Sequence, residues 1–280
     1  MNEELEGFSA LAERVKEVFP TSKQQWELSI WTPAFTTKYT VIYSKTPGVL
    51  LVAADSREVR AMAGMTKLDL DLRRPGLMSL GVPPSLVALH GPGVENARVA
   101  VNRGFERIPV GALVSVGYVG ALDPTLDVGQ IFVARQIARE GSPPKHVETP
   151  EFPRDIGVAQ GTLLTIDRVA QTCEDKRTLR RSGADAVDME AYAVAEEAER
   201  RSVPFYCVRV VSDRADTDFP VDFNRARRSD GTFAGWRVLA QAGLNPSHWK
   251  RLLSLKRDSE LASQRLADFL SICRFDVRPG

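Results

Sequence analysis

The chain has 280 residues, of which 43% are hydrophobic and 26% are charged, a composition typical of a soluble globular protein. Its 37 Lys and Arg residues are nearly matched by 36 Asp and Glu residues, so the formal net charge is only +1. A nucleic-acid-binding domain usually carries a basic excess, and we therefore expect no nucleic-acid partner.

The cysteines and histidines give no sign of a disulfide framework or a metal centre. Cys173, Cys207 and Cys273 are odd in number and lack CxxC spacing, and the three histidines stand apart, so we expect no metal site. The first residues lack the features of a signal peptide, and no apolar run reaches the roughly 18–20 residues of a membrane-spanning helix. We expect a cytoplasmic protein without a transmembrane segment.

The N-terminal part of the chain differs from the rest in its pattern. Apolar residues at helical spacing predict a helix over residues 8–19. Residues 20–47 mix aromatic and polar residues with three prolines and allow no assignment. We therefore treat 1–47 as an N-terminal appendage of unclear structure and 48–280 as a single larger domain.

From residue 48 onward, apolar segments alternate with helical ones. This alternation favours a three-layer αβα sandwich with a mixed, mostly parallel central sheet. A proline-rich segment at 141–153 is predicted to be an exposed loop. The expected strands cover 48–55, 85–93, 110–122, 129–139, 161–170 and 203–213; the expected helices cover 56–64 and 94–107, with one or two more in 237–273; and 185–201 is a strand passing into a helix.

Acidic residues follow three of the predicted strands. Glu58 comes after the first strand, Asp188 and Glu190 follow the segment "ADAV", and Asp213 ends "FYCVRVVSD". Ligands of open α/β sheets bind beyond the carboxyl ends of the strands, so these side chains are candidates for a shared site. Acids near helix starts are also favoured by the helix dipole and need no function. Their recurrence at one kind of position favours a site.

Four segments resemble the nucleoside phosphorylase and nucleosidase superfamily, which includes purine nucleoside phosphorylases and methylthioadenosine/S-adenosylhomocysteine nucleosidases. They are "LVAADSREVRAM", "HGPGVENARVA", "VSVGYVGALDPTLDVGQIFVA" and "AVDMEAYAVAEEAERRSVPFYCVRVVSDRAD". The wording "VDMEAYAVA", "RVVSDRADTDFP" and the C-terminal segment look most like the hopanoid-associated phosphorylase branch, which is linked to removal of adenine from an adenosylated triterpenoid. The resemblance implies that 48–280 is a catalytic domain of this type.

The resemblance also implies roles for residues on the ribose and base sides of a nucleoside. Glu190 would hold the 2′ and 3′ hydroxyls and stabilise positive charge on the sugar, while Met189 would pack on the sugar face. Asp213 would protonate the departing base, oriented by Ser212. A general acid needs a raised pKa, and the apolar strand before Asp213 is expected to supply the apolar surround that raises it. Asp188 keeps a structural or capping role.

The side of the nucleophile leaves two reactions open. Glu58 matches the carboxylate that activates water in hydrolytic relatives, whereas its neighbour Arg57 could serve phosphate. Tyr118, after Gly117 in the Gly-x-x-Gly turn, replaces the small hydroxyl residue of phosphate-binding members and weakens phosphorolysis. Val169 stands where many relatives have an aromatic residue beside the base, which leaves the purine specificity open.

We expect the protein to cleave the N-glycosidic bond of a purine nucleoside or a 5′-substituted adenosine derivative, adenosylhopane-like by the resemblance. Hydrolysis is favoured, with inorganic phosphate as the alternative co-substrate and no cofactor. A catalytically silent sensor or scaffold that binds a nucleoside is the alternative function. The resemblance implies a homo-oligomer, most plausibly a dimer. The basic, amphipathic C-terminal segment could instead lie on a membrane surface, although a domain-capping helix is the simpler interpretation.

Overall fold

The computed structural model describes residues 24–31, 36–43, 47–59, 61–62, 66–67, 77–80, 85–89, 91–228, 234–243 and 245–278. The chain divides into two compact units, Met1–Lys45 and Thr46–Gly280. The helix predicted at 8–19 lies outside the described residues. In the first unit, β1 (Gln24–Trp31) and β2 (Thr36–Tyr43) form an antiparallel pair in which Trp26 lies opposite Val41.

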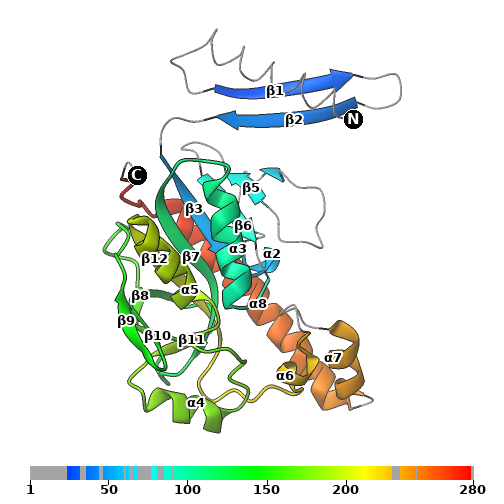
Figure 1. Ribbon diagram of the computed structural model, residues 1–280. Coiled ribbons are helices and arrows are strands. Elements are labelled where there is room, and N and C mark those ends of the chain that lie inside the picture. Colours follow the sequence, from blue (N-terminus) through cyan, green and yellow to red (C-terminus); the bar gives the residue numbers. More distant parts are fainter. Residues whose placement is uncertain are drawn as a thin grey trace. The chain divides into compact units, whose positions relative to one another are not determined.

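The second unit is built on a ten-stranded mixed sheet (Figure 1). Its order is β11-β10-β8-β12-β7-β3-β6-β5-β4, and β9 pairs with β8. The central pairs β6–β3, β3–β7 and β7–β12 are parallel, whereas β12–β8 and the pairs of β5 are antiparallel. The strands are β3 (Gly48–Ala53), β4 (Thr66–Lys67), β5 (Leu77–Leu80), β6 (Ser85–Leu89), β7 (Val110–Ala121), β8 (Ile131–Arg139), β9 (Ser142–His146), β10 (Ala159–Thr165), β11 (Ala186–Asp188) and β12 (Phe205–Asp213).

Five of these strands close on themselves. The end of β7 turns to pair with β11, in addition to its pairing with β12 along most of its length. The pairs β12–β8, β8–β10 and β10–β11 complete the ring. This closure brings the ends of β7, β11 and β12 together, which is where the acids singled out in the sequence stand.

The helices cover both faces of the sheet, which confirms the predicted three-layer α/β architecture (Figure 1). Alternate residues of β3 enter different cores because successive side chains of a strand point to opposite faces. Leu50 packs in the core that includes α3 and α5, whereas Leu51 packs in the core that includes α8. The helices are α2 (Ser56–Val59), α3 (Val94–Phe105), α4 (Cys173–Arg180), α5 (Ala191–Arg201), α6 (Phe223–Ala226), α7 (Gly235–Ala242) and α8 (Pro246–Ile272).

Three local predictions differ from the structure. The segment 141–153 was expected to be a loop, but it contains β9, an edge strand that pairs only with β8, and an edge is where a sheet tolerates prolines such as Pro143 and Pro144. The helix expected at 56–64 is described only over the four residues of α2. Helix α4 was not predicted, and it carries a residue of the site.

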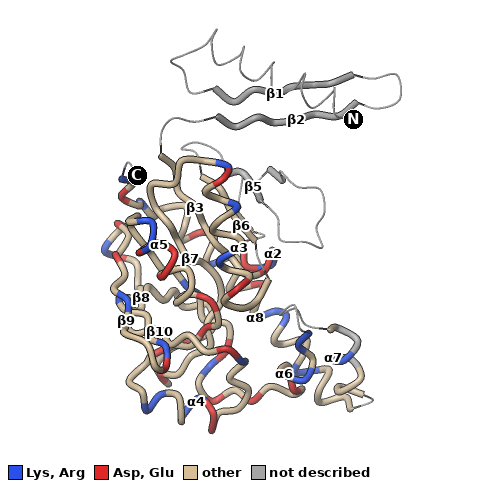
Figure 2. The backbone as a smooth tube through the Cα atoms, in the orientation of Figure 1, with Lys and Arg blue, Asp and Glu red and all other residues tan. Residues whose placement is uncertain are grey.

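Charges of both signs are interspersed through the described segments of the second unit (Figure 2). The longest helix, α8, has 27 residues and mixes apolar with charged side chains. None of the helices in the described part of the chain is both long and apolar enough to span a membrane.

Candidate functional site

A cavity of about 630 Å³ lies beyond the ends of β3, β7, β11 and β12. Eight of the nine site residues predicted from the sequence line it, and the ninth, Gly117, lies against the carboxylate of Glu58. The structure therefore brings together side chains that are far apart in the chain. The eight residues are Arg57, Glu58, Tyr118, Val169, Met189, Glu190, Ser212 and Asp213.

Glu58 reaches the cavity from α2, directly after β3. Its Oε2 accepts hydrogen bonds from the backbone N–H groups of Ala54 at 2.8 Å and Asp55 at 3.0 Å, and its Oε1 accepts one from the N–H of Tyr118 at 3.2 Å. The residue is only 7% exposed. Burial raises the pKa of Glu58 to about 7, against the opposing effect of these hydrogen bonds and of the charge on Arg209.

Gly117 makes this position of Glu58 available. Its φ is +145°, a conformation that residues with a side chain rarely adopt. A Cβ atom at Gly117 would lie 2.7 Å from Oε1 of Glu58. Glycine is therefore required here both by the backbone conformation and by the close approach of the carboxylate.

Arg57 and Tyr118 already have partners at this end of the cavity. The guanidinium of Arg57 contacts the Asp55 carboxylate at 2.6 Å, and the Arg57 side chain is 65% exposed. The Tyr118 hydroxyl lies 3.0 Å from the carbonyl oxygen of Ser259 and 3.2 Å from that of Arg57, and it can donate its hydrogen to either. Burial raises the pKa of Tyr118, so the phenol stays neutral.

Glu190 enters the cavity at the start of α5. Its Oε1 accepts a hydrogen bond from the backbone N–H of Gly93 at 2.9 Å, which ties it to the turn before α3. Burial raises the pKa of Glu190 to about 8, and the nearby charges of Asp188 and Glu58 act in the same direction. Met189 lines the cavity beside it.

Asp188 lines the cavity and belongs to a buried polar network. Its carboxylate accepts hydrogen bonds from the Thr165 hydroxyl at 2.6 Å and from the backbone N–H of Ala191 at 2.9 Å, at the start of α5. It also pairs with the Arg209 guanidinium at 2.7 Å. Asp188 thus holds the strand-to-helix turn that presents Glu190.

Arg209 was not singled out from the sequence, because it lies within an apolar strand. Its Nη2 donates to Ser115 at 2.8 Å as well as to Asp188. Among the described residues, its Nε and Nη1 are buried without a hydrogen-bond partner. Buried donors of this kind are usually satisfied by an ordered water molecule.

The surround of Asp213 differs from the prediction, because it is not simply apolar. The Ser212 hydroxyl donates to its Oδ1 at 2.6 Å, and the Lys176 ammonium lies 2.5 Å from its Oδ2. Both partners of the ion pair are buried, with side-chain exposures of 1% for Lys176 and 8% for Asp213. The predicted apolar surround is therefore wrong, because an ammonium from α4 contacts this carboxylate.

Lys176 was not predicted as a site residue, because helix α4 was not predicted. A signal for this helix does exist: Thr172 is the N-cap and accepts a hydrogen bond from the N–H of Asp175 at 3.1 Å. Acids in the first turn and arginines in the last turn also suit the helix dipole. Recognising α4 would have drawn attention to the lysine in its centre.

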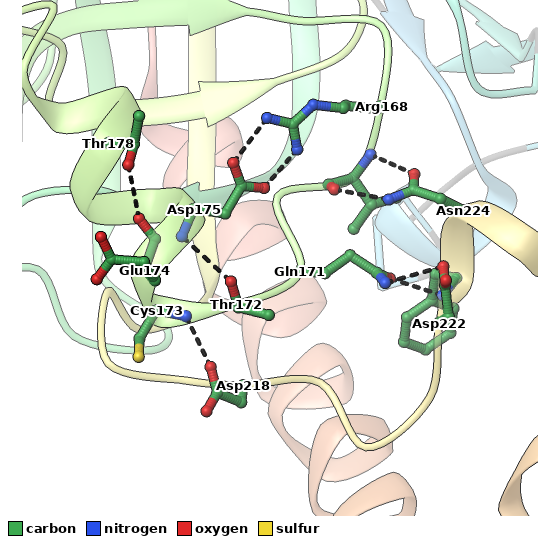
Figure 3. A network of polar contacts seen from close by, with 12 residues as sticks. Arg168, Gln171, Thr172, Cys173, Glu174, Asp175, Thr178, Asp218, Asp222 and Asn224 are labelled. Carbon is green, nitrogen blue, oxygen red and sulfur yellow. Dashed lines mark hydrogen bonds and ion pairs between the residues drawn. The ribbon is translucent and has the colours of Figure 1, made fainter.

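The wall around Val169 is fixed by a polar network (Figure 3). The backbone of Val169 exchanges two hydrogen bonds with the Asn224 side chain, at 2.8 and 3.0 Å. Gln171 donates to Asp222 at 2.9 Å, and Arg168 pairs with Asp175. These contacts join the loop before α4 to the start of α6.

Two aromatic residues missed in the sequence also line the cavity. Phe219 and Phe223 have ring centroids 5.3 Å apart in an edge-to-face arrangement. Val169 is therefore not the only apolar contact available to a bound base. Sequence comparison at one position could not identify these rings, because they come from a different segment of the chain.

Comparisons with known proteins identify the family of the chain. A family model described as the phosphorylase superfamily matches residues 77–232. The 5′-methylthioadenosine/S-adenosylhomocysteine nucleosidase of Anoxybacillus flavithermus is 26% identical over 162 residues, covering 48% of this chain and 70% of that protein. The same enzyme from Staphylococcus haemolyticus is 25% identical over 159 residues, covering 48% and 70%.

Solved structures share the fold. The 5′-methylthioadenosine/S-adenosylhomocysteine nucleosidase of Neisseria meningitidis, in complex with methylthio-immucillin-A, aligns with a TM-score of 0.58 at 18% identity, covering 81% of this chain and 97% of that one. Futalosine hydrolase of Helicobacter pylori aligns with a TM-score of 0.57 at 16% identity, covering 80% and 96%. The resemblance to the hopanoid-associated branch stays a prediction. Because the family model spans more than half of the chain, the protein belongs to the phosphorylase superfamily and is an enzyme of that family.

Proposed function

We propose that this protein hydrolyses the N-glycosidic bond of a purine nucleoside or a 5′-substituted adenosine derivative. The observation that carries the proposal is the buried Glu58 carboxylate, which lines the same cavity as Glu190 and Asp213. The names of the relatives, nucleosidases and a futalosine hydrolase, support the same reaction class. The scheme needs only water as a second substrate.

Glu58 is suited to activate that water. A general base works best when its pKa lies close to the working pH, and burial raises the pKa of Glu58 to about 7. Such a carboxylate is ionised in a large fraction of molecules at neutral pH, yet it binds a proton more readily than an ordinary glutamate does. It would take a proton from water as the water oxygen attacks the sugar carbon.

The contacts of Glu58 favour water over phosphate as the nucleophile. A phosphate ion bound at this end would need the backbone N–H groups of Ala54, Asp55 and Tyr118, and these donate to the Glu58 carboxylate. The guanidinium of Arg57, which lines this end of the cavity, is paired with Asp55. A second anion would also meet the negative charge of the ionised Glu58. These features support hydrolysis.

Glu190 would hold the ribose. A carboxyl group accepts hydrogen bonds from neighbouring hydroxyls, and in its ionised form its charge stabilises an oxocarbenium-like transition state, as in glycoside hydrolysis. The hydrogen bond from Gly93 occupies one lone pair of Oε1 and limits rotation of the side chain, and we assign Oε2 to the sugar. Met189 would pack on the sugar face.

Asp213 would face the purine and pass a proton to it as the glycosidic bond breaks. Without that proton the departing base would carry the bonding electron pair as a full negative charge. Ser212 donates to the carboxylate and so limits its rotation. Phe219, Phe223 and Val169 offer the apolar surface on which a purine ring could pack.

The test is to incubate the protein with adenosine and with 5′-methylthioadenosine, with and without inorganic phosphate, and to quantify free base, free sugar and sugar phosphate. We expect base and free sugar at a rate that does not depend on phosphate. Sugar phosphate formed only when phosphate is present would show phosphorolysis instead. Tight binding of nucleosides without turnover would support the alternative, a silent sensor or scaffold. Full activity of Glu190→Ala would contradict the assigned ribose contact.

A further inference from the structure

Lys176 is a buried charged residue next to the cavity, and its ammonium is surrounded by hydrogen-bond acceptors. Its exposure is 0%, and its Nζ lies 2.5 Å from Oδ2 of Asp213, 2.6 Å from the carbonyl oxygen of Arg214 and 3.4 Å from that of Thr217. An ammonium has three N–H donors, and here it meets three acceptors. The Phe219 ring lies 5.5 Å from the same nitrogen. The geometry is that of a fully hydrogen-bonded ammonium.

Stability alone does not explain this ion pair. A buried ion pair can often be replaced by apolar residues without loss of stability, because removing two charges from water offsets their attraction. Arginine is the usual choice for a buried pair, since its fork-shaped guanidinium binds a carboxylate through two hydrogen bonds. Lysine differs in that its ammonium gives up a proton readily once it is buried. An ammonium in this pair, unlike a guanidinium, can therefore pass a proton to the carboxylate that it contacts.

We propose that Lys176 is the source of the proton that Asp213 passes to the departing base. This inference rests on the proposed glycosidic cleavage and adds a residue to it. The Lys176 Nζ lies 2.5 Å from Oδ2 of Asp213, so a proton can pass between the two groups along one hydrogen bond. In this scheme the proton starts on Lys176.

The transfer balances without a further reactant. As the C–N glycosidic bond breaks, its electron pair stays on the base, and a proton on Asp213 moves to a ring nitrogen of that base. One N–H bond of the Lys176 ammonium breaks to supply the proton to the Asp213 carboxylate, which ends ionised as it began. Lys176 is left as a neutral amine and regains a proton from water after the products leave. The proton that water gives to Glu58 is released to solvent.

Two substrates distinguish the supply of a proton to the leaving group from the other steps of the reaction. Adenosine needs a proton on its leaving base, whereas the 4-nitrophenolate of 4-nitrophenyl β-D-ribofuranoside leaves as a stable anion without one. We compare wild type, Lys176→Arg and Lys176→Gln on both substrates, measuring kcat and KM separately and recording a thermal melt of each variant. Lys145→Arg is the matched control, because Lys145 also pairs with a carboxylate, that of Glu199, but does not line the cavity.

We expect Lys176→Arg and Lys176→Gln to lower kcat for adenosine by at least ~100-fold, with kcat for the 4-nitrophenyl riboside changed by less than ~3-fold. Arginine keeps the charge beside Asp213 but does not release a proton, so it distinguishes proton supply from charge. The proposal is overturned if Lys176→Arg keeps its adenosine activity, or if both substrates lose activity equally. If the arginine variant does not fold, the glutamine variant decides by the same two criteria. Wild type that releases no leaving group from either substrate would instead refute the proposed function itself.

Discussion

The two ends of the cavity treat their carboxylates differently. Glu58, after β3, and Glu190, at the start of α5, are held by backbone N–H groups, and no cation of the described residues contacts either carboxylate. At the end of β12, Asp213 is in direct contact with the Lys176 ammonium. Asp188, which also lines the cavity, likewise contacts a cation, Arg209.

The difference shows how one chemical group, the carboxylate, acquires two kinds of chemistry. Burial without a contacting cation raises the pKa of Glu58 to about 7 and that of Glu190 to about 8, where a carboxylate can exchange protons at neutral pH. At Asp213 an ammonium lies within hydrogen-bond distance of the carboxylate, and in the proposed scheme the proton comes from that ammonium. We therefore expect the two ends to respond differently to the same kind of substitution.

The largest expected effect is a loss of kcat that differs between the two ends of the cavity when the leaving group of the substrate is changed. Glu58→Gln removes the base that activates water, so it should lower kcat on both adenosine and 4-nitrophenyl β-D-ribofuranoside by ~100- to 1,000-fold. Asp213→Asn should cause a loss of the same size on adenosine and little change on the nitrophenyl substrate, whose leaving group needs no proton. Release of adenine and of nitrophenolate measures both.

Glu199→Gln is the control for these two variants, because Glu199 is an exposed carboxylate with its own lysine partner and does not line the cavity. If Asp213→Asn lowered kcat equally on the two substrates, the proposed difference between the two ends of the cavity would be wrong. Retention of activity in Glu58→Gln would remove the general base from the scheme.

The second prediction concerns pH at the Glu58 end. Because the ionised carboxylate is the active form of a base, kcat/KM should rise with pH through about 7 and fall about tenfold per unit below that. Stability should move the opposite way. The pKa of Glu58 is raised on folding, so its stabilising contribution is complete below the unfolded value of about 4.3 and is lost as the pH rises through about 7.

Rate profiles from pH 5 to 9 and melting temperatures over the same range would check both directions. The pH-dependent loss of stability should be smaller in Glu58→Gln, which cannot ionise at this position. An activity profile that is flat from pH 5 to 7 would show that the carboxylate does not act as the base.

Sequence reasoning located the carboxylates but not their cations. Glu58, Glu190 and Asp213 stand at strand ends, and the alternating apolar segments were enough to place those ends together. Lys176 and Arg209 lie 37 and 21 residues from the carboxylates they pair with, one in an unpredicted helix and one inside a strand. A polar residue within an apolar segment has no local signature of its partner, because the pairing depends on how the strands close into a ring.

The same limit explains the errors in the fold. The prolines of β9 indicate a loop when only their own segment is considered, and they are compatible with a strand once β8 lies beside them. Helix α4 is short and carries few apolar residues, so its N-cap and the charges of its first and last turns were its local signals. Long, strongly apolar elements such as β7 and β12 were predicted correctly, since their burial is set by composition alone.

The smallest expected effect tests whether activity depends on the position of the Glu58 carboxylate. Gly117→Ala would place a methyl group 2.7 Å from Oε1 of Glu58, whereas Gly141→Ala adds one where nothing lies within 4 Å. Both glycines have positive φ, +145° and +71°, so each substitution should destabilise the fold by about 1–2 kcal/mol. Only Gly117→Ala should also lower activity, by roughly 10-fold, because displacing a catalytic group by a fraction of an ångström weakens its alignment.

Thermal melts and kcat on the nitrophenyl substrate compare the two alanine variants. Equal loss of stability with activity lost only in Gly117→Ala would tie the rate to the position of the Glu58 carboxylate and not to general loosening of the fold. If both variants kept full activity, the close approach of the Gly117 backbone to the Glu58 carboxylate would not matter for the reaction. The contrast between the two ends of the cavity would then rest on the Lys176–Asp213 pair alone.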